Sequence, residues 1–112
     1  MNKHEDKIAR TESLFRDVNE RIAETAERFD SDDAAFVCEC SDQECTERVD
    51  ATLSEYEQVR TDGTHFLMRP GHEDERVERV VDKRGRRLAI VEKFQAAIAR
   101  AVRRSDPRTD AV

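Results

Sequence analysis

The sequence predicts an α+β fold in one domain: an N-terminal helix, a cysteine-rich β-hairpin, a short helix, a small antiparallel sheet and a C-terminal helix. Three observations support this prediction. Apolar residues recur at helical spacing near both ends of the 112-residue chain. Between these regions, short runs of β-branched and aromatic residues alternate with turn signals. Three cysteines also lie within eight residues of one another.

The first helix is predicted over residues 11–29, after a polar segment at residues 1–10 that we expect to be flexible. Its apolar positions share one face, which we expect to pack against the core. They are Leu14, Phe15, Val18, Ile22, Ala26 and Phe29. Their spacing is also close to a heptad repeat, so the same face suits pairing with a second helix, although the run is short.

A strand over residues 35–38 and a return arm over residues 46–50 form the predicted cysteine-rich hairpin. Thr52 and Glu55 then fit a capping box, in which each side chain accepts a hydrogen bond from the backbone N–H of the other residue. A short helix ending near residue 60 should therefore follow.

A strand over residues 64–69 precedes Pro70 and Gly71, which suit the second and third positions of a type II turn ending at His72. Strands over residues 77–81 and 88–91 form a second predicted hairpin, with its turn at residues 82–85.

The final helix is predicted over residues 92–104, with Phe94, Ile98, Ala101 and Val102 on one apolar face. We expect residues 105–112 to form a flexible tail. The single domain is therefore predicted to span residues 11–104.

The composition gives this domain little material for a core. Only 37% of the residues are hydrophobic, 41% are charged, and tryptophan is absent. A small chain with a thin core gains much from an additional constraint such as a metal ion. The N-terminus lacks the apolar stretch of a secretory signal, and no run approaches the ~20 apolar residues of a membrane span. We therefore expect a cytoplasmic protein that does not enter a membrane.

The cysteine cluster is the one chemical signal in the chain. Cys38 and Cys40 are two residues apart, so on an extended backbone their side chains point the same way. A four-residue polar turn then returns Cys45 to the same point. Three thiols in a reducing compartment indicate metal ligands more than a disulfide framework. Inert buried thiols and a regulatory pair of Cys40 with Cys45 are the alternatives.

A closed tetrahedral site needs a fourth ligand, and His72 is our prediction because the Pro-Gly turn fixes its backbone. His65 is the second choice, and Asp42, Glu44 or a water molecule are further alternatives. Three sulfurs with one imidazole suit zinc, so the predicted cofactor is one structural zinc ion per chain.

Several segments resemble a set of small uncharacterised bacterial proteins, chiefly actinobacterial, that share an FxCxC…C…PGHE pattern. The motifs that carry the resemblance are Phe36 to Cys40, Cys45 to Glu47, Leu53 to Tyr56, Pro70 to Glu73 and Val77 to Val81, with a further similar segment from Leu14 to Arg21. The resemblance covers about residues 12–93 and implies no activity. It does link the cysteine cluster with the Pro-Gly-His turn.

A second candidate site is a set of basic residues in the C-terminal half of the chain. Residues 1–56 carry 16 acidic and 7 basic groups, whereas residues 57–112 carry 10 acidic and 13 basic groups. The candidate binding patch comprises Lys83, Arg84, Arg86, Arg87, Arg100, Arg103 and Arg104. No aromatic residue lies among these arginines, which argues against a stacking platform for single-stranded nucleic acid.

Taken together, these features predict a non-catalytic, zinc-stabilised interaction or regulatory module whose partner is another protein. A Cys₃His site has no open coordination position, so we do not expect an enzyme, and no small-molecule substrate is indicated. The alternatives are nucleic-acid binding through the basic residues and a thiol-based redox or metal-responsive switch.

Overall fold

The computed structural model describes residues 3–108 and confirms the α+β class. A long helix, α1 (Lys3–Arg28), is followed by a hairpin of β1 (Asp33–Val37) and β2 (Arg48–Thr52), and then by the short helix α2 (Leu53–Val59). The chain continues through β3 (His65–Met68), β4 (Glu78–Arg84) and β5 (Leu88–Lys93) to the last helix, α3 (Ala96–Arg104). None of the helices within the described residues has the length and apolar character needed to cross a membrane.

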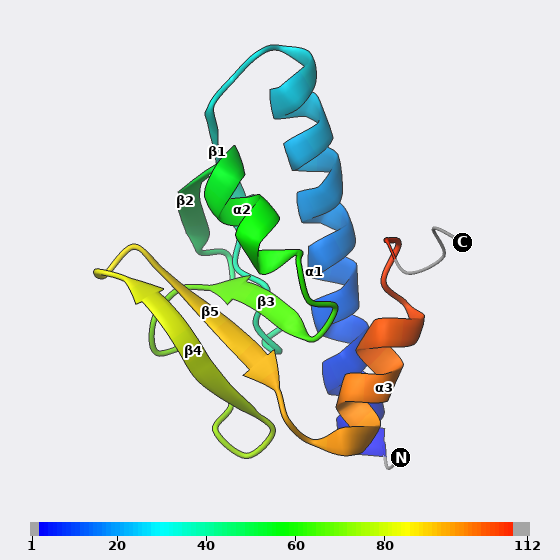
Figure 1. Ribbon diagram of the computed structural model, residues 1–112. Helices are drawn as coiled ribbons and strands as arrows, with labels where there is room; N and C mark the ends of the chain where they lie inside the picture. The colour runs from blue at the N-terminus through cyan, green and yellow to red at the C-terminus, as the bar shows by residue number, and fades with distance from the viewer. Residues whose placement is uncertain (1–2, 109–112) are drawn as a thin grey trace.

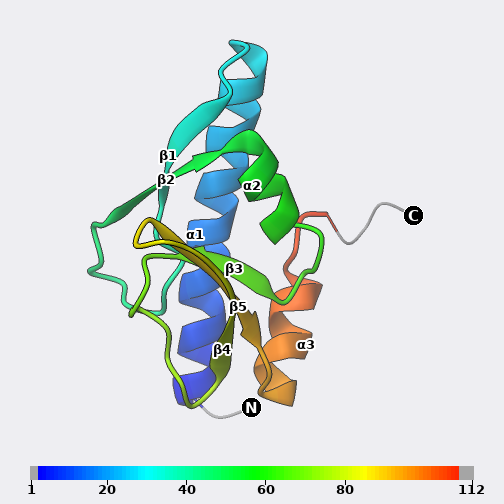
Figure 2. The same ribbon diagram turned by 60° about the vertical axis from the view of Figure 1, so that its left-hand side comes forward.

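The strands form two antiparallel sheets, one of β1 with β2 and one in the order β3-β5-β4. Both sheets lie to one side of α1 (Figure 1). Helix α3 lies beside the N-terminal half of α1, whereas α2 and the β1–β2 hairpin lie beside its C-terminal half (Figures 1 and 2). The core lies between these layers, where Phe36 and Tyr56 stack with ring centroids 4.5 Å apart.

The local signals read from the sequence are confirmed at two points. Thr52 and Glu55 form the complete capping box that begins α2. The backbone N–H of His72 donates to the carbonyl of Arg69 at 3.1 Å, and Gly71 has a φ of +92°, as the third position of a type II turn requires. Both features depend on contacts within four residues, so packing against the rest of the chain does not change them.

The ends of several elements differ from the prediction. Helix α1 begins at Lys3 rather than at residue 11, and Ile8 in the expected flexible segment is buried in the core. The second hairpin turns at residues 84–87, where the N–H of Arg87 donates to the carbonyl of Arg84, so β4 continues to Arg84 through most of the turn predicted at residues 82–85. Strand β5 continues to Lys93, which delays α3 to Ala96 and leaves Phe94 47% exposed rather than on the apolar face.

The orientation of α1 is the largest correction to the predicted packing. Leu14, Val18 and Phe29, which we expected in the core, are 60%, 38% and 74% exposed. Instead α1 buries a face that carries Ile8, Ala9, Glu12, Arg16, Asn19 and Ala23. Charged and amide groups can occupy this face because each meets a specific partner, as the following contacts show.

Arg16 and Asn19 satisfy backbone groups of other elements. The Arg16 guanidinium donates to the carbonyls of Gly63 at 2.7 Å and Val102 at 2.6 Å, near the C-terminal end of α3. It also lies 4.6 Å from the centre of the Phe66 ring. Asn19 exchanges two hydrogen bonds with the backbone of Val37, each 2.8 Å long. These bonds explain why the polar face of α1 turns inward.

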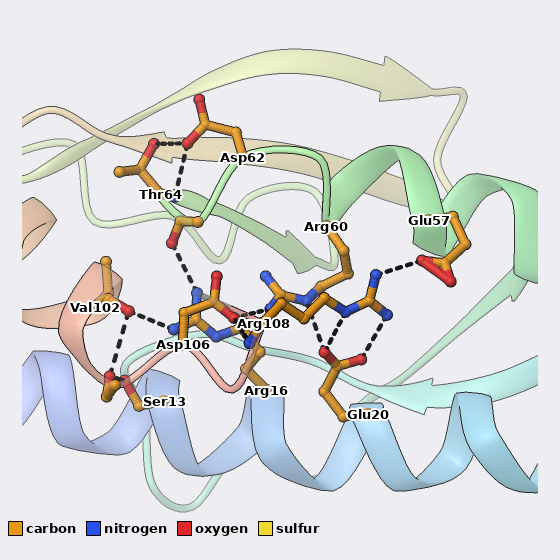
Figure 3. Close-up of polar contacts among 12 residues, drawn as sticks. Ser13, Arg16, Glu20, Glu57, Arg60, Asp62, Thr64, Val102, Asp106 and Arg108 are labelled. Carbon is orange, nitrogen blue, oxygen red and sulfur yellow. Dashed lines mark hydrogen bonds and ion pairs between the residues drawn. The ribbon is translucent and has the colours of Figure 1, made fainter. Parts of the chain in front are cut away.

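The segment after α3 is also packed, although we expected residues 105–112 to be flexible. Asp106 is 6% exposed and forms an ion pair with the buried Arg60. Arg108 donates to Glu20 on α1 at 2.6 Å and to Glu57 on α2 at 2.6 Å (Figure 3). The described part of the tail therefore joins α1 to α2, while residues 109–112 lie outside the described range.

Candidate metal centre

Four side chains predicted as metal ligands come together in one cluster. The ligand atoms of Cys38, Cys40, Cys45 and His72 all lie within 4.8 Å of one another. Cys38 and Cys40 are buried and Cys45 is half-buried. We call this group the Cys₃His cluster. Residues from two parts of the chain thus converge as the sequence predicted.

The backbone that carries Cys38 and Cys40 continues beyond β1 and lies against β3. The N–H of Cys38 donates to the carbonyl of Glu47 at 3.2 Å, and the N–H of Glu39 donates to the carbonyl of Leu67 at 2.8 Å. Cys45 returns through a turn in which its N–H donates to the carbonyl of Asp42 at 3.1 Å. Backbone hydrogen bonds therefore position both arms of the loop, and these bonds do not involve the cysteine side chains.

The fourth side chain comes from the turn that follows β3. The same turn supplies the N–H of Arg69, which donates to the sulfur of Cys38 at 3.3 Å. A backbone N–H directed at a sulfur favours a thiolate, which is the form that binds a metal. The Pro-Gly turn thus supplies both a ligand and a donor that stabilises another ligand.

The distances within the cluster match a tetrahedral metal site. His72 Nδ1 lies 3.6 Å from the sulfur of Cys38 and 3.6 Å from that of Cys45. With Zn–S bonds of about 2.3 Å and Zn–N bonds of about 2.05 Å, tetrahedral geometry separates sulfur and nitrogen by about 3.6 Å. Hydrogen bonding explains this less well, because a neutral imidazole has one acceptor nitrogen, whose lone pair cannot point at two thiols. A shared ion between the three atoms satisfies both distances.

The thiols also influence one another's ionisation in the protein without metal. The pKa of Cys40 is lowered to about 5, chiefly because Cys38 donates a hydrogen bond to it, with further hydrogen bonds from His72 and neighbouring groups. The same contact, together with burial, raises the pKa of Cys38. Burial likewise raises the pKa of Cys45. The cluster therefore already favours one thiolate at neutral pH.

Glu39, between the two buried cysteines, is a supporting residue that the sequence reading missed. Its side chain is fully buried, where it accepts hydrogen bonds from Asn19 Nδ2 at 2.7 Å and from the N–H of Leu67 at 2.8 Å. Burial raises its pKa to about 7. Glu39 thus ties the cysteine loop to α1 and β3. The sequence held a signal for this role: on an extended backbone, residue 39 faces away from the two sulfurs and therefore toward the core.

The structure places the other histidine candidate elsewhere. His65 Nε2 lies 3.3 Å from Glu92 and 3.7 Å from Asp62, in a separate group on the β3–β5 sheet. Glu92 also accepts from Arg79 at 2.9 Å, and Asp62 accepts two hydrogen bonds from Thr64. Each carboxylate already has other donors, so contacts among protein side chains account for this group. Asp42 and Glu44 are not part of the Cys₃His cluster.

The basic residues of the candidate binding patch lie in two separate places. Lys83, Arg84, Arg86 and Arg87 are at the tip of the β4–β5 hairpin, and Arg100, Arg103 and Arg104 are on α3. The tip and α3 are well separated in both views (Figures 1 and 2). At the tip, Arg87 is paired with Glu55 at 2.7 Å, and Arg84 with Asp82 at 3.0 Å. Two of the four tip cations are therefore already balanced by local carboxylates.

We expect the hairpin tip to contribute little to folding. Reversing the charges at Arg84 and Arg86 together should change the free energy of unfolding by no more than about 0.5 kcal/mol, as for other exposed groups. Reversal at Arg87 should cost more, because Glu55, its partner, also completes the capping box of α2. Urea denaturation of both variants measures the difference. A larger loss at Arg84 and Arg86 than at Arg87 would contradict this assignment.

A buried group of charges lies in the core near the N-terminal half of α1. The ammonium of Lys93 contacts the carboxylates of Glu12 and Glu78, and all three side chains are fully buried. Burial raises the pKa of Glu12 to about 7, against the opposing attraction of Lys93. Burial likewise lowers the pKa of Lys93. Two carboxylates facing one ammonium are electrically neutral only when one carboxylate holds a proton.

The pKa of Glu12 leads to a prediction about pH. The folded protein keeps this proton up to about pH 7, whereas the unfolded chain releases it near the ordinary glutamate pKa of 4.5. Stability contributed by Glu12 therefore falls as the pH rises between those values. Relative to the wild type, Glu12→Gln should gain up to about 3 kcal/mol between about pH 5 and pH 8. Urea denaturation at both pH values measures this, with Glu75→Gln in an exposed loop as the control. An equal difference at both pH values would show that Glu12 ionises normally.

Comparison with protein-family models, with curated proteins and with solved structures finds no significant match. The chemistry of the Cys₃His cluster and the surfaces around it must therefore be argued from the residues of this chain.

Proposed function

We propose that the protein is a non-catalytic interaction module whose cysteine loop is held in place by one zinc ion. The observation that carries the proposal is the position of His72 Nδ1, 3.6 Å from each of two cysteine sulfurs. Three thiolates and one imidazole are a ligand set of structural zinc sites, in which all four coordination positions come from the protein. Such a site has no position for a substrate or an activated water molecule.

The location of the Cys₃His cluster supports a structural role for the metal. The cluster joins the loop between β1 and β2 to the turn after β3, so one ion would connect the two sheets. Within residues 3–108 the loop is joined to β3 by the hydrogen bonds of Glu39 with the backbone of Leu67, and to the turn by the N–H of Arg69, which donates to the Cys38 sulfur. A zinc ion would therefore also fix the part of the loop around Cys45, beyond these hydrogen bonds.

Metal analysis of the purified protein and its ligand variants tests the proposal. We expect one zinc per chain under reducing conditions, and none in Cys38→Ser, Cys40→Ser or Cys45→Ser. His72→Ala should bind zinc more weakly, whereas the matched variant His65→Ala should retain it fully. Cobalt substitution should give the visible spectrum of a tetrahedral thiolate site. Wild-type protein that never takes up zinc would refute the proposal, and zinc loss in His65→Ala alone would reassign the fourth ligand.

A thiol switch is the second candidate function. The sulfurs of Cys40 and Cys45 lie within 4.8 Å of each other, and Cys45 is half-buried rather than enclosed. Peroxide could therefore oxidise the two thiols to one disulfide while it is itself reduced to two water molecules, and the metal would be released. Zinc release by mild peroxide that a thiol reductant reverses would favour this function. Retention of zinc under the same treatment would contradict the switch, and the structural role would be the only one supported.

A further inference from the structure

The outer face of α1, defined by Leu14, Phe15, Val18, Ile22, Thr25 and Phe29, is a largely apolar surface, of which Phe15 is half-buried and Ile22 packs in part against the core. Leu14, Val18 and Phe29 are its exposed apolar members, with Phe29 74% accessible. A groove of about 560 Å³ runs along this face, between α1 and the start of β1, where Ala34 forms part of its wall. Exposed apolar residues that form a continuous stripe indicate an interaction surface.

The spacing on this face selects another helix as the occupant. Phe15, Val18, Ile22, Thr25 and Phe29 follow one another at intervals of three, four, three and four residues. This is the repeat by which two helices pack side by side at a small crossing angle. The order of residues is also nearly symmetric about Ile22, because a phenylalanine lies seven residues away on either side. An antiparallel copy of the same helix would therefore meet a matching surface.

The charges along one edge of the outer face point to the same arrangement. Asp17, Arg21, Glu24 and Arg28 are all exposed, and within residues 3–108 none of them forms an ion pair. Their signs alternate. A two-fold axis beside Ile22 places Arg21 of each chain near Glu24 of the other, and Asp17 near Arg28. The edge is thus complementary to itself when the two helices run in opposite directions, as an isologous interface requires.

We infer that the protein forms a symmetric dimer in which the outer faces of two antiparallel α1 helices pack together. In this dimer Phe29 of each chain lies against the stripe near Phe15 and Val18 of the other chain. The inference deepens the proposed interaction role by naming a second copy of the chain as a partner. It does not depend on the metal, so zinc analysis tests the first proposal and sedimentation tests this one.

Sedimentation equilibrium of the zinc-loaded full chain provides the first test. The wild type should be a dimer, and Val18→Glu should raise the dissociation constant by about tenfold or more, because it buries an unpaired charge in the interface. Val81→Glu is the matched control, since Val81 is a 43% exposed valine on β4, away from α1. Phe29→Ser is a second variant that should weaken the dimer without touching the core. A monomeric wild type, or a dimer unaffected by both α1 variants, would overturn the inference.

A charge exchange tests the antiparallel register. Arg21→Glu places two acidic residues opposite each other across the axis, and Glu24→Arg places two basic residues there, so each variant alone should dimerise more weakly than the wild type. An equimolar mixture of the two variants should form a heterodimer, in which both cross-axis pairs are attractive again. A mixture that stays as weak as its components would refute the antiparallel register.

Discussion

Removal of the proposed zinc ion is expected to be the most damaging single change to the protein. In small zinc fingers the metal contributes about 10–16 kcal/mol to folding, because its ligands are not assembled in the unfolded chain. Part of this fold has its own apolar core, in which residues such as Phe66 and Val91 are fully buried. We therefore expect chelation to lower the melting temperature strongly while leaving α1, α3 and the β3–β5–β4 sheet largely folded.

The loosening should begin at a defined place. Glu39 remains hydrogen-bonded to Asn19 and Leu67 without the metal, so residues 41–47 and the turn at residues 69–72 should open before the rest of residues 34–72. Hydrogen exchange of the zinc-loaded and chelated protein measures this order. Cys45→Ser should reproduce the effect, whereas Thr46→Ala at the adjacent exposed position should not. Uniform exchange across the chain after chelation would mean that the metal stabilises the whole domain.

The metal should also make the protein sensitive to acid. Thiolates and neutral imidazole are the forms that bind zinc, so protonation below neutral pH releases it. Stability held by the metal is therefore lost as the pH falls, which is opposite in sign to the contribution of Glu12 over the same range. A stability maximum between the two effects is the expected profile of the wild type.

Local signals in the sequence predicted much of the fold and the whole candidate ligand set. The capping box at Thr52, the turn at Gly71 and the i, i+2 pair of cysteines each depend on neighbours in the chain. His72 reaches the cysteines because the cysteine loop lies against β3, where Glu39 and the backbone of Leu67 are hydrogen-bonded. The ligand set was predictable although His72 lies 27 and 34 residues from Cys45 and Cys38, because three clustered thiols and a histidine are a chemical signal that does not depend on the fold.

The sequence was a poor guide where the partners are distant. The amphipathic rule assumes that apolar residues face inward, yet α1 buries Glu12, Arg16 and Asn19 because Lys93, the end of α3 and the β1 backbone supply their partners. Those partners are between 18 and 86 residues away in the chain. Of the stripe that the rule assigned to the core, Leu14, Val18 and Phe29 are consequently exposed. Ala26 is buried as predicted, and Ile22 packs in part against the core. Apolar spacing identifies a surface that can pack, but it does not distinguish packing against the core from packing against a second chain.

The tail after α3 also depends on distant partners, and for that reason its packing was missed when residues 105–112 were predicted to be flexible. The carboxylate of Asp106 instead forms an ion pair with Arg60, whose side chain is fully buried at the end of α2. Glu20 also contacts this guanidinium, at 3.3 Å (Figure 3). The tail therefore neutralises an arginine that the core could not otherwise bury at low cost.

Replacing Asp106 should accordingly cost much more than a tail residue normally would. Asp106→Ala leaves the buried Arg60 with Glu20 as its remaining carboxylate, and breaking a buried ion pair typically costs about 3–5 kcal/mol. Because Glu20 still contacts Arg60, we expect a loss of about 3 kcal/mol, with a smaller loss in Asp106→Asn, which keeps the shape of the side chain. Glu57→Ala removes only an exposed partner of Arg108 and should cost less than about 1 kcal/mol. Urea denaturation of the zinc-loaded variants gives these values. A loss in Asp106→Ala no larger than that in Glu57→Ala would mean that the tail does not hold Arg60 in solution.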